Sequence, residues 1–395
     1  MEILTSNSDT LDLAIIGGGP AGTAAALEGG RLGLRTAIWE RDRFPRDKVC
    51  GEFISPAALP LLQSEIPGAL ARGAEILRAE FVSDKGMSRT FRLPRPALGL
   101  SRRVLDRALW KRCETFGIEV HEGVAVRSAQ KLGSSRDRQA ATWEIETLAG
   151  NVRQARALIV ACGRWWTVRG LLSPTRQPEL PRPGEWVGVK AHFAGIRRRS
   201  NVEMYFFHGG YCGLAPVEGD VYNVCCLVHR EQVRQCRAKA TDDFAAWVVQ
   251  VSHLTALEKR LRGAEQVSAV VTTAPVHLSR RRTKQDGALM VGDASGFLDP
   301  FTGEGISMAL HSGRLAAQAV AMASFEGFNS ERAAGIYCQS LEEAVSRSYT
   351  IAALARGLLQ GPAWLRGLVT TPLPWIGKRL VRETRWRGNR EATLT

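Results

Sequence analysis

Three glycines and one acid near the start of the chain are the first residues whose types and spacing indicate a chemistry. Gly17 permits a tight turn after an apolar run, and Gly19 lets a pyrophosphate approach the backbone. Gly22 lets a helix pack closely on a strand, and Ala21 lies in the first helical turn, where free N–H groups attract phosphates. Glu40 follows about 20 residues later, where an acid accepts hydrogen bonds from a ribose. This spacing predicts a dinucleotide site.

A second glycine-rich segment lies far along the chain. The apolar run Ala288–Val291 is typical of a buried strand. A polar passage follows it and precedes small and apolar residues that predict a helix. A glycine-rich loop before a helix N-terminus can bind a phosphate or an electron-rich ring edge. The residues that we expect in this second part of the site are Gly292, Asp293, Pro300, Gly303, Glu304, Gly305 and Ile306.

The segment Arg41–Pro56 is too polar and too marked by proline for a core element, so it predicts a long loop. It follows the second strand of the nucleotide-binding unit, and loops at the carboxyl ends of strands lie where open α/β sheets bind ligands. We therefore expect Arg41, Arg46 and Lys48 to contact phosphates or substrate. Cys50 has two interpretations: a thiol made reactive by its basic neighbours, or a structural side chain.

Two histidines are further candidates for proton transfer. His192 and His208 fall within residues 186–228, where polar and apolar residues alternate as in a sheet. An imidazole that faces a bound ligand can act as a proton donor or as a base. A purely structural role is the alternative for each histidine. The candidate catalytic residues are thus Cys50, His192 and His208.

The hydrophobic pattern indicates the elements that must position these residues. Ser101–Phe116 predicts a helix with Ser101 as its N-cap and with leucine and valine side chains facing inward. Residues 57–62 and 242–262 also predict helices, and the pattern beyond Glu331 is helical to the end of the chain. Strands are expected within residues 13–16, 36–39, 79–93, 118–121, 125–129, 142–146, 155–162, 186–228, 267–275 and 288–291.

Composition narrows the function classes. The 395 residues carry a net charge of +14, which favours an anionic partner such as a phosphate-rich cofactor, an acidic carrier protein or a membrane surface. No nucleic-acid-binding module is recognisable. The eight cysteines form no CxxC pair, so we expect reduced thiols and no metal site. Without a signal peptide or a long apolar run, the chain is predicted to be cytoplasmic, or peripheral at a membrane.

Three segments together resemble motifs of the FAD-dependent oxidoreductases whose fold is typified by the aromatic hydroxylases. The sequence GGGPAG at residues 17–22, followed by Glu40, is similar to the ADP-binding fingerprint of that family. Residues 289–306 are similar to its second FAD motif. The sequence FPRDKVCG at residues 44–51 is similar to the loop beside the flavin in the geranylgeranyl-reductase-like and halogenase-like branch.

The resemblance implies FAD as cofactor and NAD(P)H as its reductant, and it assigns residues to parts of FAD. Asp293 would contact the ribityl hydroxyls and the pyrophosphate end. Gly303, Glu304 and Gly305 would place backbone N–H groups near the pyrimidine edge of the flavin, where a helix dipole stabilises negative charge. Arg102 is similar to the arginine that reaches the FAD phosphates.

The resemblance also implies a fold class and a division into domains. The expected fold is α/β, or α+β as a whole, with a Rossmann-type FAD-binding domain, an inserted antiparallel-sheet substrate domain and a helical C-terminus. The FAD-binding domain would comprise residues 1–75, 97–185 and 275–330. The substrate domain would comprise residues 76–96 and 186–274, and the helical region residues 331–395.

The activity that the resemblance favours is a monooxygenase that hydroxylates a bulky hydrophobic or aromatic substrate, polyketide-like or lipid-like, with NAD(P)H and O2. The alternatives are a C=C reductase of isoprenoid lipids, a flavin halogenase and a flavoprotein that passes electrons to a partner. The chain has Gly213 where isoprenoid reductases have the tryptophan of a Tyr-x-Trp-x-Phe-Pro stretch, and this departure argues against a prenyl substrate.

Overall fold

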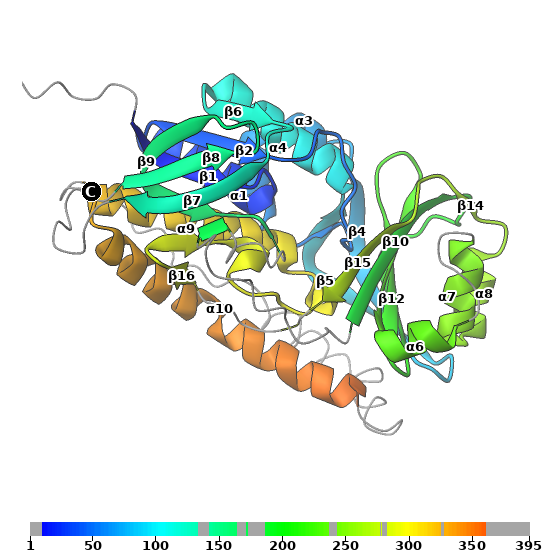
Figure 1. Cartoon of the computed structure of the whole chain (residues 1–395). Helices are drawn as coiled ribbons and strands as arrows, with labels where there is room; N and C mark the ends of the chain where they lie inside the picture. The colour runs from blue at the N-terminus through cyan, green and yellow to red at the C-terminus, as the bar shows by residue number, and fades with distance from the viewer. Residues whose placement is uncertain are drawn as a thin grey trace, which may run out of the picture.

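The computed structural model describes residues 10–132, 142–163, 171–172, 186–236, 243–276, 278, 283–324 and 328–360. Two β-sheets dominate the structure, and Figure 1 shows them next to each other, with helices on their outer sides. The predicted mixed α/β fold is confirmed. We call the sheet that contains the N-terminal strand sheet A and the other one sheet B.

Sheet A is built on parallel strands in the order β17, β9, β1, β2, β6. Parallel strands covered on both faces read as apolar runs, and all five residues of β2 are buried. Strands β16, β7 and β8 extend the sheet in antiparallel fashion. The bounds are β1 Leu11–Ile16, β2 Thr36–Glu40, β6 Glu119–Glu122, β7 Val126–Leu132, β8 Thr142–Thr147, β9 Val152–Val160, β16 Lys284–Gln285 and β17 Ala288–Met290.

Four long helices accompany sheet A. The small side chains of α1 let it pack closely against α9, and α10 packs on α9 in turn. Helix α4 has the predicted N-cap: Ser101 Oγ accepts a hydrogen bond from the N–H of Val104, at 3.2 Å. The helix bounds are α1 Pro20–Arg31, α4 Arg102–Phe116, α9 Gly305–Ser324 and α10 Ser330–Gln360, and the short helices nearby are α2 Leu59–Glu65, α3 Pro67–Leu70, η1 Gly292–Ala294 and η2 Pro300–Thr302.

Sheet B has the order β14, β10, β13, β12, β11, β4, β5, β3, with β15 also paired to β10. Its pairs are antiparallel except β4 with β11, which run parallel. One face packs on α7 and α8, whereas the other face carries aromatic side chains that contact the second glycine-rich loop. The bounds are β3 Phe53–Ile54, β4 Ala74–Val82, β5 Ser88–Gly99, β10 Trp186–Ala194, β11 Asn201–Phe207, β12 Gly210–Pro216, β13 Tyr222–His229, β14 Glu265–Gln266, β15 Val271–Val276, α6 Arg230–Gln235, α7 Phe244–Ser252 and α8 Thr255–Leu261.

Three local predictions differ from the structure. The helix expected over residues 242–262 is divided, because His253 adopts a left-handed conformation (φ 54°) between α7 and α8. The loop expected over residues 41–56 contains β3, which pairs with the end of β5. The helix expected from residue 57 begins at Leu59. The predicted C-terminal helix is present to Gln360, and residues 361–395 lie outside the described residues.

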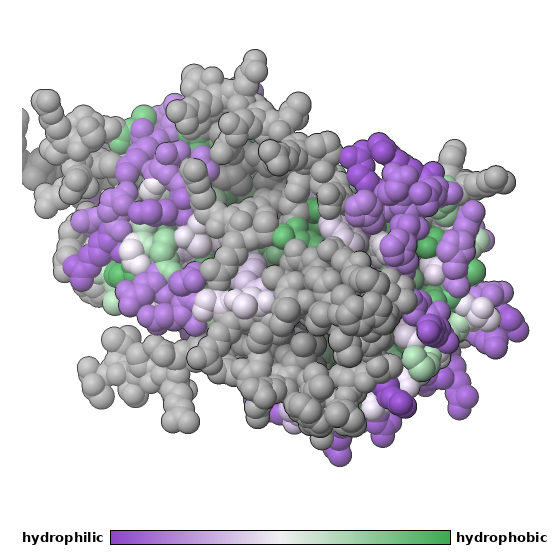
Figure 2. Space-filling view, turned by 90° about the horizontal axis from the view of Figure 1, so that it is seen from below, coloured by the Kyte–Doolittle hydropathy of each residue, from purple (hydrophilic) through white to green (hydrophobic). Residues whose placement is uncertain are grey.

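The surface seen from below Figure 1 is mainly hydrophilic where residues are coloured, with small hydrophobic areas between them (Figure 2). Within the described ranges, no helix is both long and apolar enough to cross a membrane.

Helix α9 contains a histidine that should make stability depend on pH. Burial lowers the pKa of His311 from 6.5 to about 4, although its ring lies 3.3 Å from the carbonyl oxygen of Ala57. The folded protein keeps this ring neutral while the unfolded chain takes up a proton below pH 6.5. We therefore expect His311 to cost up to about 3 kcal/mol of unfolding free energy as the pH falls from 6.5 to 4, at about 1.4 kcal/mol per pKa unit.

Urea unfolding across this pH range measures the effect. His311→Gln should remove this part of the acid destabilisation, whereas His208→Gln, which changes an exposed histidine, should not. If the unfolding free energies of the wild type and His311→Gln fell equally with pH, His311 would not be a source of the acid destabilisation.

Candidate cofactor site

A pocket of about 660 Å³ lies at the carboxyl ends of β1, β2, β9 and β17, as the sequence predicts for an α/β sheet. Its volume is in the range of small-molecule and cofactor sites. Both glycine-rich segments and the loop after β2 meet there. The predicted residues that line the pocket are Gly17, Gly19, Ala21, Glu40, Arg41, Arg46, Lys48, Cys50, Arg102, Gly292, Asp293, Pro300, Gly303, Gly305 and Ile306.

The three glycines of the first turn have different physical roles. A Cβ at Gly17 would lie 2.4 Å from the carbonyl oxygen of Ala161, and one at Gly22 would lie 1.8 Å from the oxygen of Gly17. Both glycines are therefore required for close packing, and Gly22 does not line the pocket. A Cβ at Gly19 would meet a single atom within 4 Å, Nη2 of Arg102 at 3.8 Å. Gly19 thus leaves open space in front of α1.

This open space is a cradle for an anion. Helix α1 begins at Pro20, and its N-cap Gly19 offers no side chain to the free N–H groups of the first turn. These N–H groups and the positive end of the helix dipole favour phosphate. The geometry fits the pyrophosphate of a dinucleotide.

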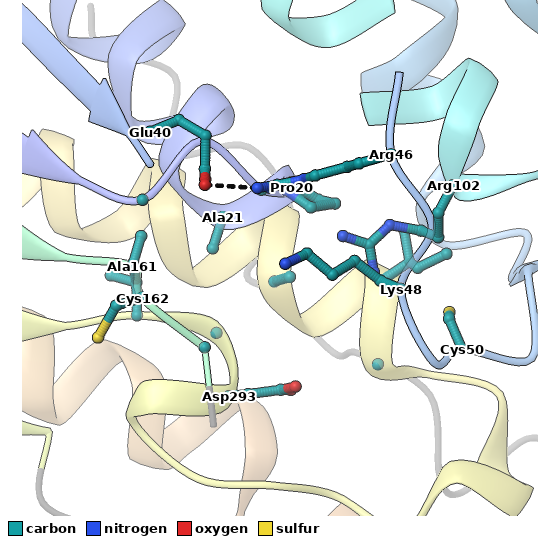
Figure 3. A pocket seen from close by; sticks show the side chains of 18 of the residues that line it. Pro20, Ala21, Glu40, Arg46, Lys48, Cys50, Arg102, Ala161, Cys162 and Asp293 are labelled. Atoms are coloured by element: carbon teal, nitrogen blue, oxygen red, sulfur yellow. Dashed lines mark ion pairs between the residues drawn. The ribbon is translucent and has the colours of Figure 1, made fainter. Parts of the chain in front are cut away.

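Glu40 is held more firmly by the protein than the sequence indicates. Its Oε2 accepts a hydrogen bond from the N–H of Gly18 at 2.7 Å, and its Oε1 accepts one from the N–H of Asp42 at 2.9 Å. Arg46 Nη1 lies 2.5 Å from the same Oε1 (Figure 3). A carboxylate has about four lone-pair sites, and these three contacts leave Glu40 room to accept a further hydrogen bond. The ribose contact of Glu40 stays a prediction.

Three cations converge on the pocket from the loop and from α4. Figure 3 shows the side chains of Arg46, Lys48 and Arg102 together on the side of the cavity opposite Asp293. Arg46 Nε is buried and lacks a hydrogen-bond partner within the described structure. An anion placed between these side chains would supply the acceptor that Arg46 Nε lacks. The unsatisfied Arg46 Nε therefore also fits the phosphates of FAD.

The acids beside these cations hold them in position. Arg102 forms two hydrogen bonds with Asp106, at 2.7 and 2.8 Å. Burial opposes the charge of Arg102, but the adjacent Asp106 carboxylate raises its pKa. For Lys48, burial and the charge of Arg46 lower the pKa, despite a hydrogen bond of 2.7 Å to Asp42. A phosphate near Lys48 would stabilise its charged form.

The second glycine-rich loop forms the opposite wall of the pocket. The carboxylate of Asp293 points into the cavity (Figure 3). Gly305 begins α9, and a Cβ there would have no neighbour within 4 Å. Gly303 has a left-handed φ of 71°, and a Cβ there would lie 2.8 Å from the ring of Phe53. Glu304 does not line the pocket. Its buried carboxylate accepts a hydrogen bond from Ser55 Oγ at 3.0 Å, so its side chain ties this loop to the segment after β3.

An aromatic surface of sheet B borders the second loop. Phe53 and Phe297 line the pocket and belong to an apolar cluster with Tyr211. The Tyr211 hydroxyl donates a hydrogen bond to Asp299 at 3.1 Å, and its ring contacts that of Phe301 edge to face. These contacts attach sheet B to the loop that precedes α9.

The candidate catalytic residues are not brought together as a set. Cys50 lines the pocket and interacts with Arg102. His192 is buried on β10, outside the pocket lining, and its Nε2 lies 2.7 Å from Oε2 of Glu52. His208 is exposed at the turn between β11 and β12 and does not line the pocket. The structure therefore connects Cys50 directly, and His192 through Glu52, to the site, and it leaves His208 apart.

Two further residues at the site, Glu52 and Lys190, are not among those predicted from the sequence. Glu52 lines the pocket and is fully buried between His192 and Lys190. Burial alone would raise the pKa of Glu52, but the hydrogen bond from His192 and the charge of Lys190 lower it overall. The sequence feature that could have indicated this pair is Lys190 itself, because a charged residue within the apolar strand β10 needs a buried partner.

No group of three or more potential metal ligands occurs in the part of the chain that the structure describes. Similarity to known proteins points instead to FAD. A family model described as an FAD binding domain matches residues 10–327. Digeranylgeranylglycerophospholipid reductase 2 of Methanopyrus kandleri is 27% identical over 345 residues, which are 86% of this chain and 84% of that protein.

Conditioned medium factor receptor 1 of Dictyostelium discoideum is 26% identical over 348 residues, and the match covers 79% of this chain and 63% of that longer protein. A solved flavin-dependent brominase has a similar fold, with a TM-score of 0.75 and 20% identity over 94% of this chain and 93% of that chain. The match to the FAD-binding domain spans both glycine-rich motifs and both sheets. The chain belongs to the family of FAD-dependent oxidoreductases that share this domain.

Proposed function

We propose that the protein is an FAD-dependent monooxygenase that hydroxylates a bulky hydrophobic or aromatic substrate. The observation that carries the proposal is the aromatic surface between sheet B and the second loop, from which Phe53 of β3 and Phe297 of the loop continue into the lining of the cofactor pocket. A substrate with an apolar ring or chain could bind there and exclude water. When bound, FAD supplies the two-electron chemistry between NAD(P)H and oxygen.

The overall reaction balances with one NAD(P)H. A C–H bond of the substrate becomes C–OH with one atom of O2. The other atom leaves as water, for which the hydride of NAD(P)H supplies two electrons and one hydrogen and the solvent supplies one proton. The chain's own residues bind and orient the reactants. Arg46, Lys48 and Arg102 would bind the FAD phosphates, and the N-terminus of α9 would stabilise negative charge at the flavin.

A C=C reductase of isoprenoid lipids is the second candidate. It is favoured by the loop at residues 44–51, which lines the pocket with Cys50, and by the similarity to an archaeal lipid reductase. Gly213 argues against a prenyl substrate. It lies on β12 beside Met204 and contributes no aromatic ring where isoprenoid reductases have a tryptophan. Halogenation is a further outcome that the experiment below distinguishes, and electron transfer to a protein partner would yield none of the products that it detects.

The proposal extends to partners and location. We propose a small hydrophobic substrate, free or attached to an acidic carrier protein, because the net charge of +14 suits an acidic partner. A cytoplasmic location, with peripheral binding to a membrane surface when the substrate is a lipid, is consistent with this chemistry.

Product analysis tests the proposed reaction. FAD-loaded protein is incubated with NADH or NADPH, isotope-labelled O2, chloride or bromide, and panels of aromatic, polyketide-like and polyprenyl compounds. We expect a product that gains one labelled oxygen atom. A product that instead gains two hydrogens without oxygen would establish the reductase, and one that gains a halogen would establish the halogenase; either result would overturn the monooxygenase.

A further inference from the structure

We propose that Glu52, together with Lys190 and His192, forms a buried charge cluster that positions the loop wall of the pocket and sets the electrostatic potential at the flavin. Glu52 is in this view a positioning residue. The inference relies on FAD binding, which the family shows, and not on the choice between monooxygenase and reductase.

The contacts of the cluster join two distant segments of the chain. Oε1 of Glu52 lies 2.5 Å from Nζ of Lys190, and Oε2 lies 2.7 Å from Nε2 of His192, across 138 and 140 residues of sequence. The three residues are 0%, 1% and 5% exposed, respectively. Buried charges persist only when they are paired and hydrogen-bonded, so this arrangement fixes the loop to β10.

The carboxylate of Glu52 also contacts the N-terminus of α4, where Arg102 lies. Oε1 of Glu52 accepts a hydrogen bond from the N–H of Arg102, the first residue of α4, at 2.8 Å. The carbonyl oxygen of Glu52 accepts one from the N–H of Leu100 at 3.1 Å. Arg102 lines the pocket, so a change at Glu52 is transmitted to the cofactor site through this backbone contact.

The backbone of Glu52 supports a specific role. Its φ of +55° lies in the left-handed region that residues other than glycine rarely adopt. Such conformations persist where surrounding contacts determine them, and they are concentrated at functional sites. The bonds of the Glu52 carboxylate to Lys190, His192 and Arg102 help to hold this conformation, together with the backbone bond from Leu100.

The charges of the cluster are arranged asymmetrically around the pocket. Glu52 lines the cavity, whereas Lys190 and His192 lie behind it. Among the described residues, Lys190 also pairs with Asp47, whose Oδ1 lies 3.7 Å from Nζ. Charges in a water-poor site act strongly on a bound flavin, because little solvent screens them. Removing the charge of Glu52 should stabilise a reduced, negatively charged flavin, and removing that of Lys190 should have the opposite effect.

A double-mutant cycle tests the proposal by two measurements. Glu52→Gln, Lys190→Met and the double variant are compared with the wild type for their thermal unfolding without FAD and for the reduction potential of bound FAD. We expect each single substitution to lower the Tm, because it leaves a buried charge unpaired, and the double variant to be more stable than the sum of the two losses predicts. We expect Glu52→Gln to raise the potential, Lys190→Met to lower it, and the double variant to lie between them.

A matched control separates electrostatic positioning from general destabilisation. Glu203 is also fully buried and paired with a cation, Arg260 at 2.7 Å, but it lies outside the pocket lining. Glu203→Gln should lower the Tm and leave the potential unchanged. If Glu52→Gln does not fold, Lys190→Met and the double variant still carry the test. The double variant must then have a higher reduction potential than Lys190→Met, and it must fold although Glu52→Gln alone does not.

Two results with the variants would overturn the proposed role of Glu52. Potentials of Glu52→Gln and Lys190→Met that shift in the same direction, or that match Glu203→Gln, would show a purely structural role. Strictly additive losses of Tm would show that the pair is not coupled. A wild-type protein that binds no FAD would refute the cofactor assignment separately, and the unfolding cycle without FAD would still decide whether the pair is coupled.

Discussion

Replacing Gly19 by valine is expected to abolish FAD binding without unfolding the protein. The backbone of Gly19 has φ −77° and ψ −177°, which any residue adopts, and a Cβ there would meet only Nη2 of Arg102, at 3.8 Å. The added side chain would instead fill the open space in front of α1, where the pyrophosphate must approach. We expect at least a 100-fold loss of affinity, or about 2.7 kcal/mol.

Flavin content after purification and titration of the apo-protein with FAD measure this loss. The control is Gly335→Val, which places the same side chain on the exposed side of α10, where a Cβ has no neighbour within 4 Å. Its affinity for FAD should equal that of the wild type. Wild-type flavin content in Gly19→Val would refute the position assigned to the pyrophosphate.

Replacing Gly313 by valine is expected to destabilise the FAD-binding part of the fold strongly. Helices α1 and α9 cross so closely at Gly313 that a Cβ would lie 2.1 Å from the carbonyl oxygen of Ala21 and 3.1 Å from the nitrogen of Ala25. These are backbone atoms, which cannot rotate away as a side chain does. We expect a loss of about 3 kcal/mol of unfolding free energy, the upper end for an overpacked core, and a loss of FAD because Ala21 belongs to the phosphate cradle.

Urea unfolding of the apo-protein measures the effect, with Gly335→Val again as the control. Gly313→Ala should lose less than Gly313→Val, because it adds fewer atoms at the crossing. A Gly313→Val protein within about 0.5 kcal/mol of the wild type, the range of ordinary surface substitutions, would mean that the helices separate at little cost.

The parts of the structure that local sequence determines could be predicted well. The strands and helix around the first glycine turn follow from apolar runs and from glycine spacing, and β1, α1 and β2 lie where they were expected. The N-cap of α4 follows from the type of Ser101. Most predicted cofactor residues line one pocket because the carboxyl ends of parallel strands meet at one edge of a sheet.

Contacts between distant segments could not be predicted in this way. Nothing near Glu52 indicates that Lys190 lies beside it, since 138 residues separate them and the contact depends on how the loop packs on sheet B. Likewise, the exposure of His208 depends on where β11 ends, and strand ends are the least certain part of a pattern. The burial of Glu304 toward Ser55 depends on how the second loop packs beside β3.

The reaction of the reduced, FAD-loaded protein with oxygen tests the central claim most directly. Rapid mixing with oxygenated buffer, with and without an aromatic ligand, is followed by absorbance. A monooxygenase should accumulate a species spectrally distinct from both reduced and oxidised flavin before oxidised flavin returns, because its site excludes water. Direct return of oxidised flavin in a single step under every condition would contradict the monooxygenase and favour the reductase or an electron-transfer role.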